Sequence, residues 1–237
     1  MVTLPSGTSL EYMMSRPAQH ADASEDTTKL AICLHPWSWL GGRMTDPVLD
    51  IVTEPLLRRG YEVLRYNSRG VGKSKGWPSL TGGQEVEDLK ELVQWARSSR
   101  PSLSKLVILG YSHGSLVASM HPVLQGVETS HILLSYPLGP RQWLTAFHSH
   151  RYATALTNLV SDSRSRTLVI YGDHDDFTSV ESYDSWAGVL WSHHAERERD
   201  AAQPGELDIV KIEGASHFWR EPQAVERLVQ IVERWVP

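Results

Sequence analysis

The sequence contains a single cysteine, Cys33, in 237 residues. A disulfide framework and a zinc site built from four thiolates are therefore both excluded. Because disulfides are typical of oxidising compartments, this scarcity favours a cytoplasmic protein. A chain of this length can bury a full hydrophobic core without disulfides or metals. We expect one domain over residues 1–237, since open α/β sheets often reach this size as one unit.

Long apolar runs and a surplus of basic residues are also missing. No apolar run approaches the roughly 18–20 residues that a membrane-spanning helix needs. Residues 1–29 lack the basic and apolar segments of a secretory signal. The net charge of −5 comes without a basic stripe that could neutralise phosphates, which argues against nucleic acid as a partner. We expect a monomer or homodimer whose partner is a small molecule.

Short apolar runs of strand length recur along the chain, at residues 30–34, 61–66, 106–109, 132–136, 168–171 and 207–212. Their continuous apolar character predicts strands that are buried on both faces, as in a parallel sheet. Amphipathic helical patterns lie between them, including residues 46–59, 84–97 and 222–235. The alternation indicates an α/β fold with a mostly parallel central sheet and helices on both faces. Ligands of such sheets bind at the carboxyl ends of the strands.

A Gly-x-Ser-x-Gly pattern, residues 110–114, directly follows the third of these strands. A serine on a tight strand-to-helix turn takes a strained backbone conformation, and glycines two residues to either side leave the space that the turn requires. The residues after it have a helical pattern, so a helix N-terminus would lie beneath the hydroxyl. This context predicts that Ser112 is a nucleophile rather than an ordinary loop serine.

A nucleophilic serine needs a general base, and the base needs an orienting carboxylate. In folds of this class the acid and the histidine follow the serine in chain order, each after a strand. His217 follows the last predicted strand and is the candidate base. The loop after the preceding strand offers three candidate acids: Asp173, Asp175 and Asp176. No spacing typical of metal ligands accompanies them, and we expect neither a metal nor a cofactor.

Five motifs in this order resemble those of the α/β-hydrolases, in particular small, nearly capless members related to dienelactone hydrolases. They span nearly the whole chain, at residues 34–36 with 41–44, 66–76, 110–114, 172–176 and 214–218. The resemblance implies the α/β-hydrolase fold. It also implies that Asp175, three residues after the glycine at the strand end, is the acid. Dienelactone hydrolases use a cysteine nucleophile, so their lactone substrate does not carry over to Ser112.

The resemblance also implies an oxyanion hole made of two backbone N–H groups. One belongs to His113, directly after the nucleophile. The other lies in the loop after the first strand, where Pro36 has no N–H and Trp37 is the remaining choice. Tryptophans near these loops are candidates to line a substrate pocket, although most tryptophans in proteins simply pack in the interior. The candidates are Trp39, Trp143 and Trp219.

Two other patterns, a candidate phosphate-binding loop and several closely spaced histidines, have simpler structural explanations. Residues 69–74 (RGVGKS) resemble a phosphate-binding loop, but Asn67 stands where that loop needs its first glycine. We expect instead that Arg69 and Ser74 stabilise a structural turn through hydrogen bonds. We expect exposure to solvent for four histidines in polar stretches: His148, His150, His193 and His194.

Residues 138–165 leave room for only a short insertion, because they must also supply a helix that covers the sheet. One short extra helix fits at residues 141–147, whereas a cap of several helices does not. The expected site is therefore open and shallow. We predict a serine hydrolase that cleaves small or exposed carboxylic esters or thioesters through an acyl-enzyme on Ser112. The same triad could serve an amidase, a peptidase or non-hydrolytic chemistry, and a ligand-binding protein could keep the fold without catalysis.

Overall fold

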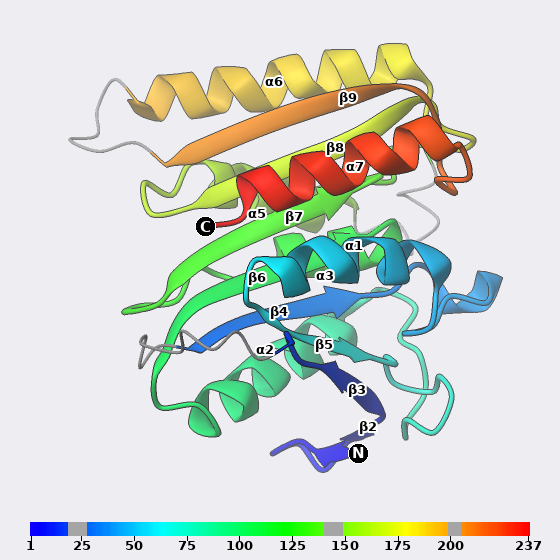
Figure 1. Ribbon diagram of the computed structural model, residues 1–237. Coiled ribbons are helices and arrows are strands. Elements are labelled where there is room, and N and C mark those ends of the chain that lie inside the picture. The colour runs from blue at the N-terminus through cyan, green and yellow to red at the C-terminus, as the bar shows by residue number, and fades with distance from the viewer. Residues whose placement is uncertain (19–27, 140–148, 199–204) are drawn as a thin grey trace.

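The computed structural model describes residues 1–18, 28–139, 149–198 and 205–237. Its main sheet has seven strands in the order β3-β5-β4-β6-β7-β8-β9 (Figure 1). Strand β3 pairs antiparallel with β5, and the other pairings in this sheet are parallel. The strands are β3 Tyr12–Ser15, β4 Thr28–Leu34, β5 Glu62–Tyr66, β6 Leu103–Tyr111, β7 Glu128–Leu134, β8 Arg166–His174 and β9 Glu206–Ser216. A separate antiparallel pair precedes them, formed by β1 (Val2–Thr3) and β2 (Ser9–Leu10).

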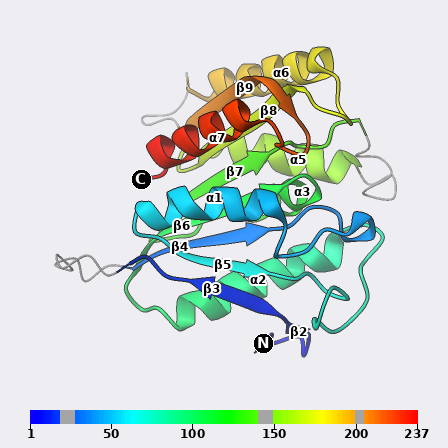
Figure 2. The ribbon, with the colours of Figure 1, turned by 45° about the vertical axis from the view of Figure 1, so that its right-hand side comes forward.

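Helices cover both faces of the main sheet (Figures 1 and 2). On one face lie α1 (Pro47–Arg58) and α7 (Pro222–Trp235), and their apolar residues share a core with alternate strand residues. The opposite face is covered by α2 (Gly83–Ser98), α3 (His113–Ser119), α5 (Ser149–Val160) and α6 (Val180–Glu198). Because successive side chains of a strand point to opposite faces, the continuous apolar runs fill both cores. This arrangement confirms the predicted α/β architecture.

The strands differ from their predicted bounds where polar residues take part in the pairing. Strand β9 extends to Ser216, four residues beyond the predicted end. Strand β7 is shifted towards the N-terminus and ends at Leu134. Strand β4 begins at Thr28, two residues before its predicted start. Apolar residues identify the buried part of a strand, whereas hydrogen bonding continues through polar residues that leave no such signal.

The turn after β5 is held as predicted. The guanidinium of Arg69 donates to both carboxylate oxygens of Asp88 at 2.8 and 2.6 Å. Ser74 Oγ donates to the carbonyl oxygen of Asn67 at 2.7 Å and accepts from the backbone N–H of Glu11 at 2.8 Å. These bonds confirm the structural reading of the RGVGKS stretch.

The expectation of exposed histidines is wrong for His194, which is buried. Its Nδ1 lies 3.1 Å from the carbonyl oxygen of Val160, at the end of α5. Helix α6 packs against α5 on the face that carries His194. The residues next to His194 in the sequence are polar and do not reveal that contact. His150 is exposed and His193 is half-buried, while His148 lies outside the described residues.

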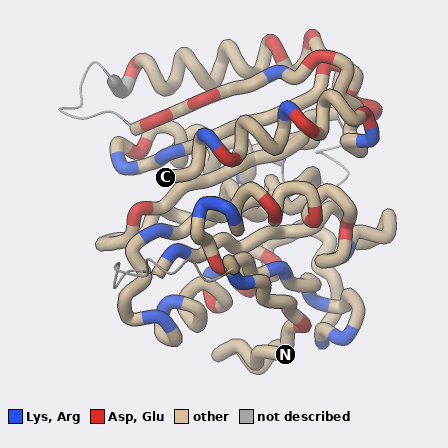
Figure 3. The backbone as a smooth tube through the Cα atoms, in the orientation of Figure 1, with Lys and Arg blue, Asp and Glu red and all other residues tan. Residues whose placement is uncertain are grey.

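Charged residues of both signs are distributed over the described chain, without a long segment of one sign (Figure 3). Within the described ranges, no helix combines the length and apolar character needed to cross a bilayer.

The register of the sheet brings distant loops together at the carboxyl edge. Leu34 of β4 pairs with Gly110 of β6, which places the loop after β4 beside the start of α3. A Cβ on Gly114 would lie 2.5 Å from the carbonyl oxygen of Leu34, so only glycine allows this approach. At the other side of the sheet, His174 of β8 pairs with Ser216 of β9. The loops that carry the predicted acid and base therefore start from adjacent strand ends.

Replacing Gly114 with alanine tests this close approach. We expect Gly114→Ala to lower the free energy of unfolding by about 1–3 kcal/mol, because the new methyl group meets the backbone of β4 rather than a movable side chain. Gly188→Ala is the matched control, since a Cβ at this exposed helical position meets no atom within 4 Å. It should be neutral or stabilise by about 0.5–1 kcal/mol. Denaturant unfolding of both variants measures the difference, and equal stabilities would contradict the packing argument.

Candidate active site

Ser112 lies at the sharp turn between β6 and α3. Its φ of 53° and ψ of −121° are rare for a residue other than glycine. The backbone N–H of Ser112 donates to the carbonyl oxygen of Leu134 at 2.8 Å, which ties the turn to the neighbouring strand β7. A Cβ on Gly110 would lie 2.3 Å from the carbonyl oxygen of Gly114, so the two glycines permit this geometry. The turn has the strained conformation that the pattern predicts.

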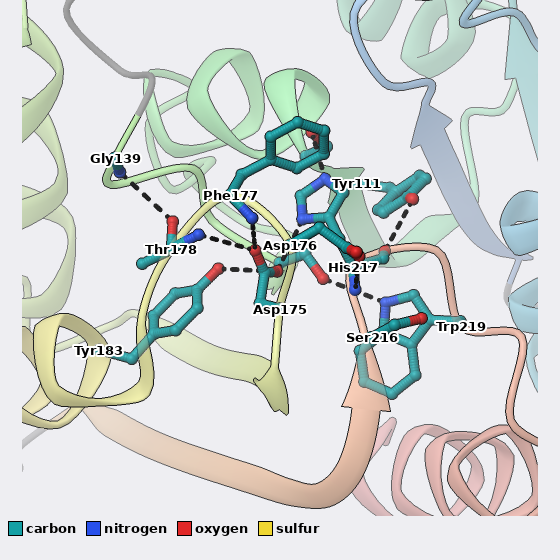
Figure 4. Close-up of polar contacts among 12 residues, drawn as sticks. Tyr111, Gly139, Asp175, Asp176, Phe177, Thr178, Tyr183, Ser216, His217 and Trp219 are labelled. Atoms are coloured by element: carbon teal, nitrogen blue, oxygen red, sulfur yellow. Dashed lines mark hydrogen bonds and ion pairs between the residues drawn. The ribbon is translucent and has the colours of Figure 1, made fainter.

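The side chain of Ser112 faces His217, which follows β9. Ser112 Oγ lies 3.0 Å from His217 Nε2, and both residues are buried. The hydroxyl of Tyr111 donates to the carbonyl oxygen of His217 at 2.9 Å, so the residue before the serine holds the histidine loop. The ring of Phe177 packs edge-on to the imidazole, with ring centroids 4.7 Å apart (Figure 4). The imidazole is thus restrained from two sides.

The three candidate acids have separate contacts, and Figure 4 shows those of Asp175 and Asp176. Asp175 Oδ2 lies 2.6 Å from His217 Nδ1, on the side of the ring opposite Ser112. Asp176 Oδ2 accepts instead from the backbone N–H of His217 at 3.1 Å. Asp173 Oδ1 accepts from the backbone N–H of Gly214 at 2.7 Å. Only Asp175 among these three contacts the imidazole itself.

Hydrogen-bond donors surround the Asp175 carboxylate. Its Oδ1 accepts from the backbone N–H groups of Phe177 and Thr178 at 2.9 and 3.0 Å. The hydroxyl of Tyr183 lies 3.3 Å from Oδ2. Donors of this kind fix the orientation of the carboxylate towards His217.

The loop after β4 carries Trp37 at the start of a short 3₁₀ helix, η1 (Ser38–Leu40). The preceding carbonyl, that of Pro36, belongs to the same peptide group as the Trp37 N–H and lies 2.6 Å from His35 Nδ1. The other ring nitrogen, Nε2, lies 3.0 Å from the backbone N–H of Ser68. Because that N–H can only donate, Nε2 accepts and the proton is on Nδ1, which donates to Pro36. Burial lowers the pKa of His35 to about 4, so the ring stays neutral near pH 7.

Two hollows lie close to Ser112 and share Trp37. The first, the aromatic pocket, has a volume of about 120 Å³. It is lined by Ser112 and His217 together with Pro36, Trp37, Leu40, Gly41, Gly42, Asp46, Tyr111, Phe177 and Phe218. The second is a narrower slot of about 30 Å³, whose lining includes Trp39, Tyr66, Glu85 and His113. Ser112 and His217 therefore line the aromatic pocket, whereas the slot is reached by the next residue, His113.

The predicted tryptophans have different positions. Trp39 is 64% exposed, lines the slot and stacks on Trp37 with ring centroids 6.4 Å apart. Trp143 lies outside the described residues. The expectation for Trp219 needs correction, because this residue is 2% exposed and packs in the core beneath α1 and α7. Its indole N–H donates to Ser135 Oγ at 3.0 Å, so its partner is the protein interior and not a substrate.

Several residues of the site were not predicted from the sequence. Tyr111 occupies a variable position of the glycine-serine pattern, Phe218 ends the motif that contains the base, and Phe177 adjoins the acid without belonging to a motif. Asp46 was assigned only to the start of a helix, yet it lines the aromatic pocket. Within the described part of the chain, no group of three or more histidine, cysteine or acidic residues is arranged to hold a metal ion.

Comparison with solved structures places this fold among the α/β-hydrolases. The chain is similar to an α/β serine hydrolase homologue from Coxiella burnetii, with a TM-score of 0.71 and 23% identity over 98% of this chain and 94% of that one. A lidless α/β serine hydrolase from Xanthomonas campestris gives a TM-score of 0.68 and 25% identity over 99% and 93%. An esterase from Pyrococcus furiosus gives 0.69 and 20% over 99% and 88%.

These similarities confirm the α/β-hydrolase fold and the resemblance to small members of the superfamily. The sequence model of the X-Pro dipeptidyl-peptidase (S15) family matches residues 6–231, almost the whole chain. The chain therefore belongs to the X-Pro dipeptidyl-peptidase (S15) family.

Proposed function

We propose that this chain is a serine hydrolase that cleaves carboxylic esters or thioesters, with Ser112 as nucleophile, His217 as general base and Asp175 as the orienting acid. The observation that carries the proposal is the continuous chain of contacts from Ser112 Oγ through the imidazole to the Asp175 carboxylate, at 3.0 and 2.6 Å. The strained turn at Ser112 adds to it, because strain of this kind persists where the surrounding structure imposes it.

His217 carries the proton in both halves of the reaction. Ser112 Oγ attacks the ester carbonyl carbon while its proton passes to His217 Nε2. The tetrahedral intermediate collapses, the bond to the leaving oxygen breaks, and Nε2 returns the proton to that oxygen. Water then attacks the acyl-enzyme with His217 again as base, which releases the acid and restores Ser112. Asp175 stabilises the imidazolium that forms in both steps.

The Trp37 and His113 N–H groups are the proposed oxyanion donors. No hydrogen bond to another described atom occupies the Trp37 N–H. Two such donors would each lower the barrier by about 3–4 kcal/mol. The hydrogen bond from His35 to the Pro36 carbonyl orients the same peptide group and polarises its N–H, so His35 is a positioning residue in this proposal.

A small substrate group suits the aromatic pocket of about 120 Å³, since a cavity of about 150 Å³ accommodates a group of benzene size. The similarity to an esterase supports ester cleavage, whereas membership of the S15 family favours a peptidase with the same triad. An ester panel run beside an X-Pro p-nitroanilide distinguishes these two substrate classes.

Labelling with a fluorophosphonate tests the nucleophile directly. We expect one covalent adduct on the parent protein by intact mass and none on Ser112→Ala, because the probe needs an activated serine. On p-nitrophenyl esters we expect acetate and butyrate to react faster than decanoate. Ser112→Ala and His217→Ala should lower kcat by about 10⁴-fold or more. Folded parent protein that takes no label would favour a ligand-binding protein without catalysis.

Substitution of the three aspartates tests the assignment of the acid. Asp175→Asn should lower kcat by about 10³-fold, because an amide cannot stabilise the imidazolium. Asp173→Asn and Asp176→Asn should each stay within about tenfold of the parent, since their carboxylates contact only backbone N–H groups. Steady-state rates on one ester, with thermal unfolding as a folding check, provide the comparison. A larger loss from Asp173→Asn would move the acid to that residue.

His35 offers a third test, in which kcat and KM respond differently. His35→Ala should lower kcat by about 10²-fold with little change in KM, because only the transition state uses the oriented Trp37 N–H. Asn places an amide where Nδ1 stands and can still donate to Pro36, so His35→Asn should recover most of the loss. Equal activities of the folded Ala and Asn variants would show that the ring merely fills space.

A further inference from the structure

The aromatic pocket has one acidic side chain in its wall. Asp46 is the sole Asp, Glu, Lys or Arg residue among the described residues that line it. Most of the remaining wall is apolar or aromatic. A carboxylate in such surroundings is poorly solvated, and burial accordingly raises the pKa of Asp46. A ligand group that could pair with it would relieve this cost.

In the described part of the chain, only one oxygen of the Asp46 carboxylate has a hydrogen-bond partner. It caps α1, where Oδ1 accepts from the backbone N–H of Val48 at 2.9 Å. Within the described chain, its Oδ2 has neither a hydrogen bond nor an ion pair. The cap fixes the position of the side chain, and one oxygen remains for another partner.

The charged groups near the pocket are mainly negative. Tyr111 is part of the wall, and after burial the main influences that raise the pKa of its phenol are Asp46, Asp175 and Asp176, against a lowering effect of Arg220. Arg220 lies outside the lining, with its guanidinium 4.8 Å from the ring centroid of Phe218. Three carboxylates therefore lie close enough to Tyr111 to act on its phenol, against one guanidinium. Asp175 contacts the His217 ring and Asp176 its backbone N–H, and of the three only Asp46 belongs to the pocket lining.

Aromatic rings make the same space suitable for a cation. Trp37, Tyr111, Phe177 and Phe218 contribute to the wall. A cation is attracted to the face of an aromatic ring, and rings combined with a carboxylate form the usual binding site for ammonium groups. A neutral alkyl group of the same shape would gain from the rings but not from the charge.

We propose that the aromatic pocket binds an ammonium group of the substrate, with Asp46 as its counter-ion, so that the preferred esters are cationic. This inference rests on the proposed ester hydrolysis at Ser112. Because Ser112 and His217 belong to the same lining, an ammonium group within a few bonds of the ester carbonyl would reach Asp46.

The test compares choline acetate with 3,3-dimethylbutyl acetate, in which carbon replaces the charged nitrogen. We expect the parent to have at least about tenfold higher kcat/KM for the choline ester, in the range that one charged contact provides. Asp46→Asn keeps the helix cap and removes the charge. It should abolish this preference through a rise in KM for choline acetate and leave the neutral ester within about twofold. Glu54→Gln, on the same helix and outside the lining, is the charge-matched control and should keep the preference.

Three results would overturn the inference. One is equal cleavage of the two esters by the parent. Another is an equal loss of activity on both esters in Asp46→Asn, which would assign the carboxylate to stabilising protonated His217. The third is the same preference in the parent and in Asp46→Asn.

Binding of tetramethylammonium, followed by calorimetry, separates this inference from the catalytic proposal. The parent should bind the ion and Asp46→Asn should not, whether or not any ester is cleaved. Absence of binding to the parent would contradict the cation site. Failure of fluorophosphonate labelling with intact binding would instead count against the proposed hydrolysis alone.

Discussion

The close contact between the start of α3 and the end of β4 is the constraint on which the site depends. Gly110 and Gly114 let the chain reverse at Ser112 without a clash between strand and helix. The same contact brings the loop of His35 and Trp37 next to the nucleophile. A side chain at either glycine would force the backbones apart. One steric condition thus positions both the serine and the proposed oxyanion donors.

Backbone N–H groups distinguish the three aspartates of one loop. Asp173 and Asp176 accept from the backbone of the histidine loop and so join β8 to the end of β9. Asp175 accepts from its own loop, which leaves its second oxygen directed at His217. Two carboxylates therefore fix where the histidine lies, and the third fixes how its ring is turned. Chemically identical groups acquire different roles from their neighbours.

The surroundings of Ser112 are asymmetric. On one side, aromatic rings and Asp46 line the larger pocket, and nearby the narrower slot is lined by polar side chains that include Glu85 and His113. Burial lowers the pKa of His113 in the slot to about 4, so this ring is neutral near pH 7. The two hollows thus differ in size and in the chemistry of their walls. This difference provides a physical basis for selectivity.

The sequence by itself determined the architecture, because alternating apolar runs and amphipathic helices have few ways to pack. It also singled out Ser112 and His217, since the strained turn requires glycines at set spacings and the base must follow the last strand. The choice among Asp173, Asp175 and Asp176 needed either a family resemblance or the structure, because residues this close share a loop and differ only in orientation. Trp219 and His194 were misjudged because burial depends on elements that meet only in the folded chain. The place of Asp46 in the pocket wall was likewise decided by tertiary structure: a helix cap is a local feature, whereas the pocket is built from four distant segments.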